Sequence, residues 1–293
     1  MKLIQAGDLD IAYLEIGPAD GMVAILLHGF PYDVHAYGEV GERLASAGLR
    51  CIVPYLRGYG LTRFRSPQTP RSGEQAALGA DLLALMDALS IPKALLGGYD
   101  WGGRAACIVA ALWPERVRGL VSCGTGYNIQ DIARAGLPAA PEDEARFWYQ
   151  YYFNTERGKA GLEANRRALC RFIWKSWSPL WDFDDRIFEQ SAAAFDNPDF
   201  AEIVIHSYRH RYGVVPGDPA LRAIEARLAD QPLIGVPTIV MQGGADGVDP
   251  PKPDDHDAPH FSGAYRRAVL PGIGHNFPQE APAAFAEALL SLA

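Results

Sequence analysis

The stretch GGYDWGG (97–103) follows a short apolar run at 93–98 and precedes a helical pattern. A strand that turns sharply into a helix, with small residues on both sides of the bend, is the arrangement that presents a nucleophile. Gly98 and Gly102 stand two residues before and two residues after Asp100. An Asp at this position is also a good helix N-cap. The stretch therefore predicts a strand, a turn and a helix with a carboxylate at the bend, and partner residues must decide its role.

The sequence around this stretch alternates between short aliphatic runs and longer helical patterns. This alternation is typical of a parallel sheet covered by helices on both faces. The earlier stretch 8–17 alternates like an exposed antiparallel edge strand. The expected strands are 22–29, 50–56, 93–98 and 117–124, and the expected helices are 34–48, 79–90 and 106–113.

The alternation stops after Cys123 and returns with strands expected at 235–244 and 265–275 and a closing helix at 283–292. About a hundred residues lie between, too many for a structureless loop. Their patterns are helical, and four of the six tryptophans fall there. An apolar cavity between these helices and the sheet would suit a small molecule. We therefore expect three segments: a core at 1–127, a helical cap insertion at 128–232 and the rest of the core at 233–293.

The composition excludes several classes of function. The chain has 293 residues, is 48% hydrophobic and carries a net charge of -8 without a basic stripe, which excludes a nucleic-acid binder. We find no secretion signal and no membrane-spanning stretch, so a cytoplasmic protein is expected. Four scattered cysteines without CxxC spacing predict buried free thiols.

Two further residues complete a catalytic pattern with Asp100. In hydrolases with this turn, the chain order is nucleophile, acid and histidine. Asp246 follows the strand expected at 235–244, and His275 follows the last strand. Asp249 is a rival for the acid, but it lies three residues further from the strand.

The sequence HGFP (28–31) follows the strand at 22–29, where this arrangement places one donor of an oxyanion hole. The backbone N–H groups of Phe30 and Trp101 could together hold a developing negative oxygen.

Together these motifs cover nearly the whole chain and resemble the α/β-hydrolase superfamily, in particular its branch with an Asp nucleophile. That branch comprises epoxide hydrolases, haloalkane dehalogenases and fluoroacetate-type dehalogenases. The resemblance implies a mostly parallel central sheet flanked by helices, with an inserted all-helical cap. It also implies that Asp100 displaces oxygen or halide from an sp3 carbon, and that His275, oriented by Asp246, activates the water that hydrolyses the alkyl ester.

The leaving group separates the members of this branch, because an epoxide oxygen needs an acid whereas a halide does not. FWYQYYF (147–153) is similar to the YQxYF segment of epoxide hydrolases, which places Tyr149 on the first catalytic tyrosine and Gln150 beside it. HSYRHRYG (206–213) is similar to the segment carrying the second, which matches Tyr208. These matches favour epoxide opening; close competitors for the two positions are Tyr151, Tyr152 and Tyr212.

A haloalkane or haloacid dehalogenase with the same triad is the alternative. Trp101 is compatible with a halide donor, but Phe30 replaces the Asn that supplies another donor in one large dehalogenase group; Trp174 or Trp177 could substitute. Fluoroacetate-type enzymes carry DRGGR, and this chain has DWGGR, which keeps only Arg104 of the two arginines. A non-catalytic small-molecule receptor on a hydrolase scaffold is a third hypothesis, disfavoured by the complete triad.

The expected substrate is a small apolar molecule that reacts with water, without a cofactor, nucleic acid or membrane. The sequence is compatible with a homodimer. His206 and His210 stand one helical turn apart and DDHDAPH (254–260) is rich in metal-ligand types, but no step needs a metal and none is expected. The residues expected to line the substrate pocket are Phe30, Trp101, Gln150, Trp177 and Phe277.

Overall fold

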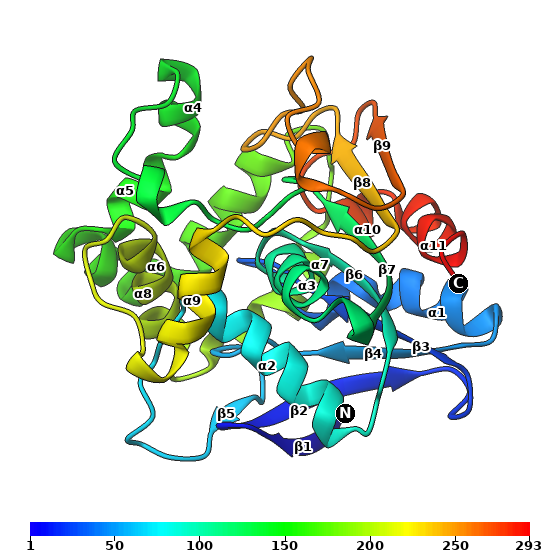
Figure 1. Ribbon diagram of the computed structural model, residues 1–293. Coiled ribbons are helices and arrows are strands. Elements are labelled where there is room, and N and C mark those ends of the chain that lie inside the picture. The colour runs from blue at the N-terminus through cyan, green and yellow to red at the C-terminus, as the bar shows by residue number, and fades with distance from the viewer.

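The computed structural model describes residues 1–293 and is built on one nine-stranded sheet (Figure 1). The strand order is β1-β2-β4-β3-β6-β7-β8-β9, with β5 paired to β2. All pairings from β4 to β9 are parallel, whereas β1, β2 and β5 pair antiparallel. The strands are β1 (Lys2–Ala6), β2 (Leu9–Ile16), β3 (Met22–Leu27), β4 (Leu49–Pro54), β5 (Arg63–Phe64), β6 (Ala94–Tyr99), β7 (Val117–Cys123), β8 (Thr238–Gly243) and β9 (Tyr265–Leu270).

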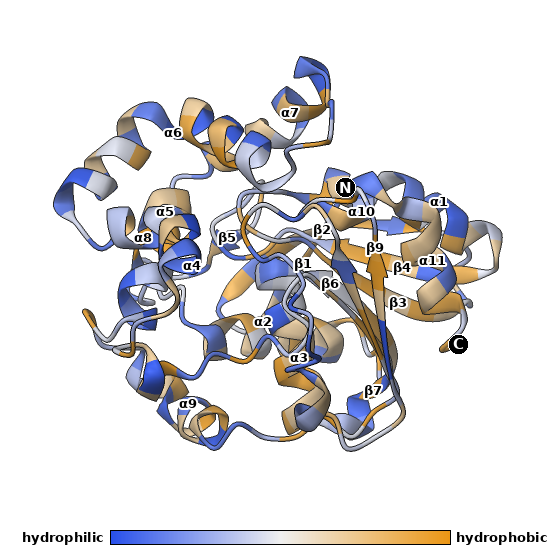
Figure 2. Ribbon diagram, turned by 90° about the horizontal axis from the view of Figure 1, so that it is seen from above, coloured by the Kyte–Doolittle hydropathy of each residue, from blue (hydrophilic) through white to orange (hydrophobic).

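Helices cover both faces of this sheet. In Figure 2, α1 and α11 lie on one side of it, and α2 and α3 lie on the other. The central strand β6 is buried at every position because helices pack against both of its faces. The bounds are α1 (Gly38–Ser46), α2 (Gln75–Ala88), α3 (Asp100–Leu112), α10 (Phe277–Glu280) and α11 (Pro282–Leu290).

The segment between β7 and β8 contains only helices. Most of these lie together on the left in Figure 1. The segment 141–153 forms two helices separated at Phe147. The following long helix is kinked at Asn165, whose φ is -123°. The helices are α4 (Pro141–Arg146), α5 (Trp148–Phe153), α6 (Glu156–Trp177), α7 (Asp185–Ala192), α8 (Phe200–Arg211) and α9 (Arg222–Ala229).

The sequence therefore predicted the α/β-hydrolase fold, with local differences. The elements β1, β5 and α10 were not expected. The stretch 8–17 forms β2, which is antiparallel as expected but lies inside the sheet, because β1 pairs with its outer side. The helix α9 was not expected. The prediction of buried free thiols is confirmed for all four cysteines. No helix combines the length and apolar character needed to cross a membrane.

Candidate functional site

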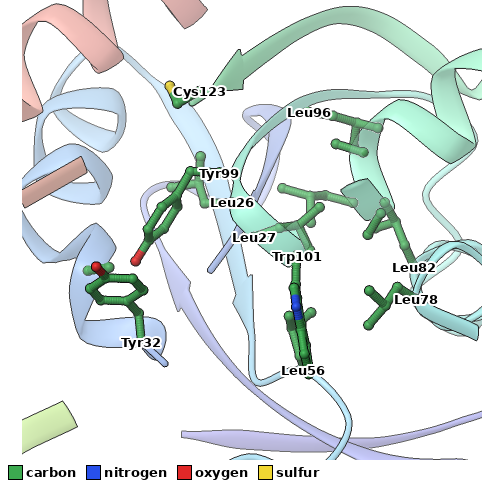
Figure 3. Packing of buried hydrophobic residues seen from close by; sticks show 14 of the residues in the cluster. Leu26, Leu27, Tyr32, Leu56, Leu78, Leu82, Leu96, Tyr99, Trp101 and Cys123 are labelled. Carbon is green, nitrogen blue, oxygen red and sulfur yellow. The ribbon is translucent and has the colours of Figure 1, made fainter. Parts of the chain in front are cut away.

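The turn between β6 and α3 places Asp100 in a strained backbone conformation. Asp100 has a φ of 49°, in the left-handed region that L-residues rarely adopt. Strand and helix approach closely here: a Cβ on Gly102 would lie 2.0 Å from the carbonyl oxygen of Leu27, and one on Gly98 would lie 2.6 Å from the carbonyl group of Gly102. Only glycine fits at these two positions. Figure 3 shows Tyr32 and Tyr99 facing each other on one side of this turn, with Trp101 on the other side, near Leu56.

The carboxylate of Asp100 is held by one of its two oxygens. Oδ1 accepts a hydrogen bond of 2.6 Å from the backbone N–H of Phe30. Although burial favours the neutral acid, His275, Arg104 and this N–H together hold the pKa of Asp100 below its usual range. Asp100 is therefore ionised at neutral pH.

His275 lies beside the other oxygen of Asp100. It follows β9, and its Nε2 atom is 3.8 Å from Oδ2 of Asp100, where it has no hydrogen-bond partner. Its Nδ1 atom is 2.7 Å from Oδ2 of Asp246. The structure thus brings the three residues of the expected triad together.

The loop after β8 distinguishes the two candidate acids. Oδ1 of Asp246 accepts hydrogen bonds of 2.9 Å from the backbone N–H groups of Val248 and Asp249, which fixes the carboxylate against His275. Asp249 instead accepts a hydrogen bond from the hydroxyl of Thr125 and does not contact the imidazole.

The two carboxylates determine the charge of His275. Burial disfavours the imidazolium, but Asp246 and Asp100 outweigh it and raise the pKa of His275 to about 10. At neutral pH the free site therefore contains an imidazolium between two carboxylates.

Two backbone N–H groups were expected to form an oxyanion hole. That of Phe30 already binds Oδ1 of Asp100. That of Trp101 belongs to the first turn of α3, where N–H groups lack helical partners. The indole Nε1 of Trp101 is also buried without a partner.

Tyr149 on α5 and Tyr208 on α8 lie against each other. Their rings are nearly perpendicular, with centroids 5.4 Å apart, and both side chains are buried. Burial raises the pKa of both hydroxyls above the usual value, so both remain protonated and can donate.

The three competing tyrosines have other surroundings. The hydroxyl of Tyr151 donates to Glu144, and that of Tyr212 donates to Oε1 of Gln150 at 3.0 Å. The hydroxyl of Tyr152 lies against Gly161 on α6.

A cavity of about 390 Å³ adjoins Asp100 and His275. Tyr149 and Gln150 are in its wall, as are Arg104 and Arg211. Four residues expected to line the pocket are buried and are not part of its wall: Phe30, Trp101, Trp177 and Phe277. The rings of Trp101 and Trp177 pack against that of Phe30.

Three residues of the site were missed by the sequence analysis. Nδ2 of Asn128 donates to the carbonyl oxygen of Asp100 at 2.7 Å. Ser178 accepts hydrogen bonds from the backbone N–H groups of His275 and Asn276 and donates to Glu280 at 2.6 Å. These contacts join distant segments, and no local sequence pattern marks them.

The residues considered for metal binding have structural contacts. In the 254–260 loop, Asp257 accepts from the backbone N–H of Tyr127 at 3.1 Å. His206 accepts from the N–H of Gly73 at 3.0 Å. His210, Glu74 and Glu225 lie close together between α2 and the helices α8 and α9. One potential metal-ligand atom of each residue lies within 4.8 Å of those of the other two.

Comparison with known proteins gives consistent matches. Residues 24–281 match the alpha/beta hydrolase fold family. A solved structure from Klebsiella pneumoniae, described as a candidate epoxide hydrolase, is 48% identical with a TM-score of 0.97, over 99% of this chain and 96% of that one. Epoxide hydrolase A of Mycobacterium tuberculosis is 28% identical over 99% of this chain and 95% of its own length. Epoxide hydrolase 3 of Siraitia grosvenorii is 39% identical over 121 residues, 41% of this chain and 36% of its own length.

Proposed function

The chain belongs to the alpha/beta hydrolase fold family, where it is most like the epoxide hydrolases, and on this basis we propose that it opens epoxides to vicinal diols through an ester on Asp100. One observation carries the proposal. Oδ1 of Asp100 is bound by the N–H of Phe30, whereas Oδ2 is held by no N–H group and faces the imidazole of His275 beside the cavity. The carboxylate thus has one anchored oxygen and one oxygen available to attack carbon.

In the first step, Oδ2 of Asp100 attacks an epoxide carbon and the ring C–O bond breaks. The epoxide oxygen leaves as an alkoxide and takes a proton from Tyr149 or Tyr208. The two hydroxyls are suited to this role because they are neutral and belong to one pair of packed rings.

Ester formation then changes the protonation of His275. Asp100 loses its negative charge on alkylation, so one of the two carboxylates that raise the pKa of His275 is removed. The pKa of the imidazolium falls, and it returns a proton to the tyrosinate. The free Nε2 atom is then a neutral base.

In the second step, His275 takes a proton from water and the hydroxide adds to Cγ of Asp100. We assign the stabilisation of the charge that develops on Oδ1 to the N–H groups of Phe30 and Trp101. Collapse breaks the bond between Cγ and Oδ2, and His275 protonates the departing diol. The carboxylic acid left on Asp100 passes its proton to His275, which restores the ion pair.

A dehalogenase remains the second candidate because of Trp101. Its indole Nε1 is buried without a partner beside the nucleophile, as a halide donor would be. Trp174 does not add a donor, since its Nε1 donates to the carbonyl oxygen of Pro31 at 2.6 Å. Trp177 is the other tryptophan that could do so.

The test is incubation with styrene oxide and, separately, with haloalkanes and haloacetates, measuring diol and halide release. We expect diol from the wild type and none from Asp100→Ala. Asp20→Asn, which changes an exposed carboxylate between β2 and β3, serves as the control. Halide without diol would overturn the epoxide assignment, and binding without any turnover would favour a receptor.

We further propose that residues 128–232 act as the cap over a hydrolase domain formed by 1–127 and 233–293. We place the enzyme in the cytoplasm and expect it to need no cofactor. Its substrates on this proposal are small epoxides with apolar parts, since the aromatic layer beside Asp100 contains Phe30, Trp177 and Tyr208.

A further inference from the structure

Two guanidinium groups stand in the wall of the catalytic cavity. Arg104 comes from α3, one turn after Asp100, and Arg211 is the last residue of α8. Neither forms an ion pair with any carboxylate of the protein within 4.0 Å. Neither guanidinium therefore has a carboxylate in direct contact, and Asp100 acts on Arg104 only over a longer distance.

Arg104 is surrounded by uncharged acceptors. Its side chain is buried, with the residue only 6% exposed, and it donates to the backbone oxygen and to Oδ1 of Asn128 at 3.3 and 3.0 Å. Burial and the neighbouring Arg211 lower the pKa of Arg104 to about 10, with Asp100 acting in the opposite direction. A buried cation without a close anion is costly, so a bound anion would stabilise it.

Arg211 is likewise bound only by neutral groups. Its Nη1 donates to Oε1 of Gln150 at 3.0 Å, and its guanidinium lies 4.9 Å from the ring centroid of Tyr208. With its amide oriented to place oxygen toward Arg211, Gln130 accepts two further hydrogen bonds. Gln150 also donates to the hydroxyl of Tyr149 at 3.1 Å. Arg211 therefore packs on the ring of Tyr208 and is linked to Tyr149 through Gln150, the two tyrosines proposed to protonate the epoxide oxygen.

The acidic groups of the cavity wall form no ion pair with Arg104 or Arg211. Asp100 faces His275, Glu144 accepts from Tyr151, and Asp249 accepts from Thr125. The fourth acidic group, Asp131, makes no ion pair.

We propose that Arg104 and Arg211 bind a carboxylate of the substrate, so that this enzyme prefers epoxides with a carboxylate group near the oxirane ring. This inference rests on the proposed function. A carboxylate matches the planar fork of a guanidinium and would supply the close anion that neither guanidinium has. Binding it at Arg211 would place the epoxide oxygen toward Tyr149 and Tyr208.

The test compares 3-phenylglycidate with its uncharged amide, 3-phenylglycidamide. We expect the wild type to have a kcat/KM at least about tenfold higher for the acid than for the amide. Arg211→Gln should lower the value for the acid by about 30-fold, mainly through KM, and the acid-to-amide ratio should fall at least about tenfold. Arg211→Lys, which keeps the charge, should retain part of the preference.

The matched control is Arg209→Gln on the same helix. Arg209 is not part of the cavity wall and donates to Glu156 at 2.8 Å, so its replacement should leave the ratio unchanged. Equal kcat/KM values for acid and amide in the wild type, or an unchanged ratio in Arg211→Gln, would overturn the inference.

A binding measurement separates this inference from the proposed function. Calorimetry with 3-phenylpropanoate and 3-phenylpropanamide, which have no epoxide, should show tighter binding of the carboxylate, weakened at least about tenfold by Arg211→Gln. If the carboxylate binds in this way but no epoxide reacts, the anion site stands and the epoxide hydrolase proposal fails. If epoxides react but the carboxylate has no advantage, the proposed function stands and the anion site fails.

Discussion

Nδ1 of His275 lies 2.7 Å from Oδ2 of Asp246. Because the second oxygen of Asp246 is fixed by two backbone N–H groups, this contact sets the orientation of the imidazole. Asp246→Asn should lower kcat by about 10²- to 10⁴-fold, because an amide orients and stabilises the imidazolium less well than the carboxylate does. Asp249→Asn should stay within about tenfold of the wild type. Steady-state diol formation by the two variants checks this, and the reverse ranking would make Asp249 the orienting acid.

Replacing His275 should separate the two proposed steps. In His275→Gln, attack by Asp100 remains feasible but the base is lost, so diol release should fall at least about 10³-fold while an alkyl ester accumulates. Mass spectrometry should then show one substrate added per protein. Asp100→Asn with the same epoxide is the control and should show no addition. An unmodified His275→Gln protein would contradict the covalent mechanism.

The paired tyrosines should act in the first step only. Tyr149→Phe and Tyr208→Phe should each slow single-turnover ring opening by about 10²-fold, and the double variant should be slower than either. Tyr152→Phe is a matched control because its hydroxyl lies against Gly161 on α6. If neither single variant slows alkylation, the donors are other groups.

The stability of the protein should depend on pH through Asp249. Burial and the nearby Asp246 raise the pKa of Asp249 from its usual value of 3.8 to about 6. The folded protein thus binds this proton more tightly than the unfolded chain, so the resulting stability is present below pH 4 and is lost as the pH rises through 6. Asp249→Asn should raise the free energy of unfolding at pH 8 by about 1 kcal/mol, and by less at pH 4.5. Urea unfolding at both pH values, with Asp20→Asn as control, measures the change in the free energy of unfolding. An equal gain in stability at pH 8 and pH 4.5 would show that the ionisation of Asp249 is not its cause.

The turn that holds Asp100 should tolerate no Cβ at Gly102. Gly102→Ala places a methyl group 2.0 Å from the backbone oxygen of Leu27, which cannot move without breaking the sheet, so we expect a loss of about 4 kcal/mol or more. Gly38→Ala, at the start of α1, meets no atom within 4 Å and should change stability by less than about 1 kcal/mol. Midpoints of urea unfolding or soluble yields give the comparison.

Local patterns made much of this fold predictable. Parallel strands that are buried on both faces give continuous apolar runs in the sequence, as in β6. The glycines on both sides of Asp100 indicate that the strand and helix backbones approach closely. The helix α9 was missed because its segment was not recognised as amphipathic. The position of β2 in the sheet was misjudged. Alternation of polar and apolar residues shows that one face of a strand is polar, but it does not show whether another strand pairs with its free edge.

The remaining features depend on contacts between distant segments. Asn128 and Asp100 are 28 residues apart, and Ser178 reaches Glu280 across 102 residues. The two arginines of the cavity come from separate helices, and only the folded chain shows that neither forms an ion pair with a carboxylate. Motif order predicted three side chains that the structure brings together, because each follows a strand end, where parallel strands place functional side chains together.

The hydrogen bond from Phe30 to Oδ1 of Asp100 makes the two oxygens of that carboxylate unequal. In the proposed reaction, Oδ2 departs with the diol and an oxygen from water replaces it, so the enzyme exchanges one of its own atoms at every turnover. In H₂¹⁸O, the first product molecule from each active site should carry no label, and Asp100 should become heavier by one ¹⁸O. Labelled diol should appear only from the second turnover onward, so the amount of unlabelled diol would equal the number of active sites that have reacted.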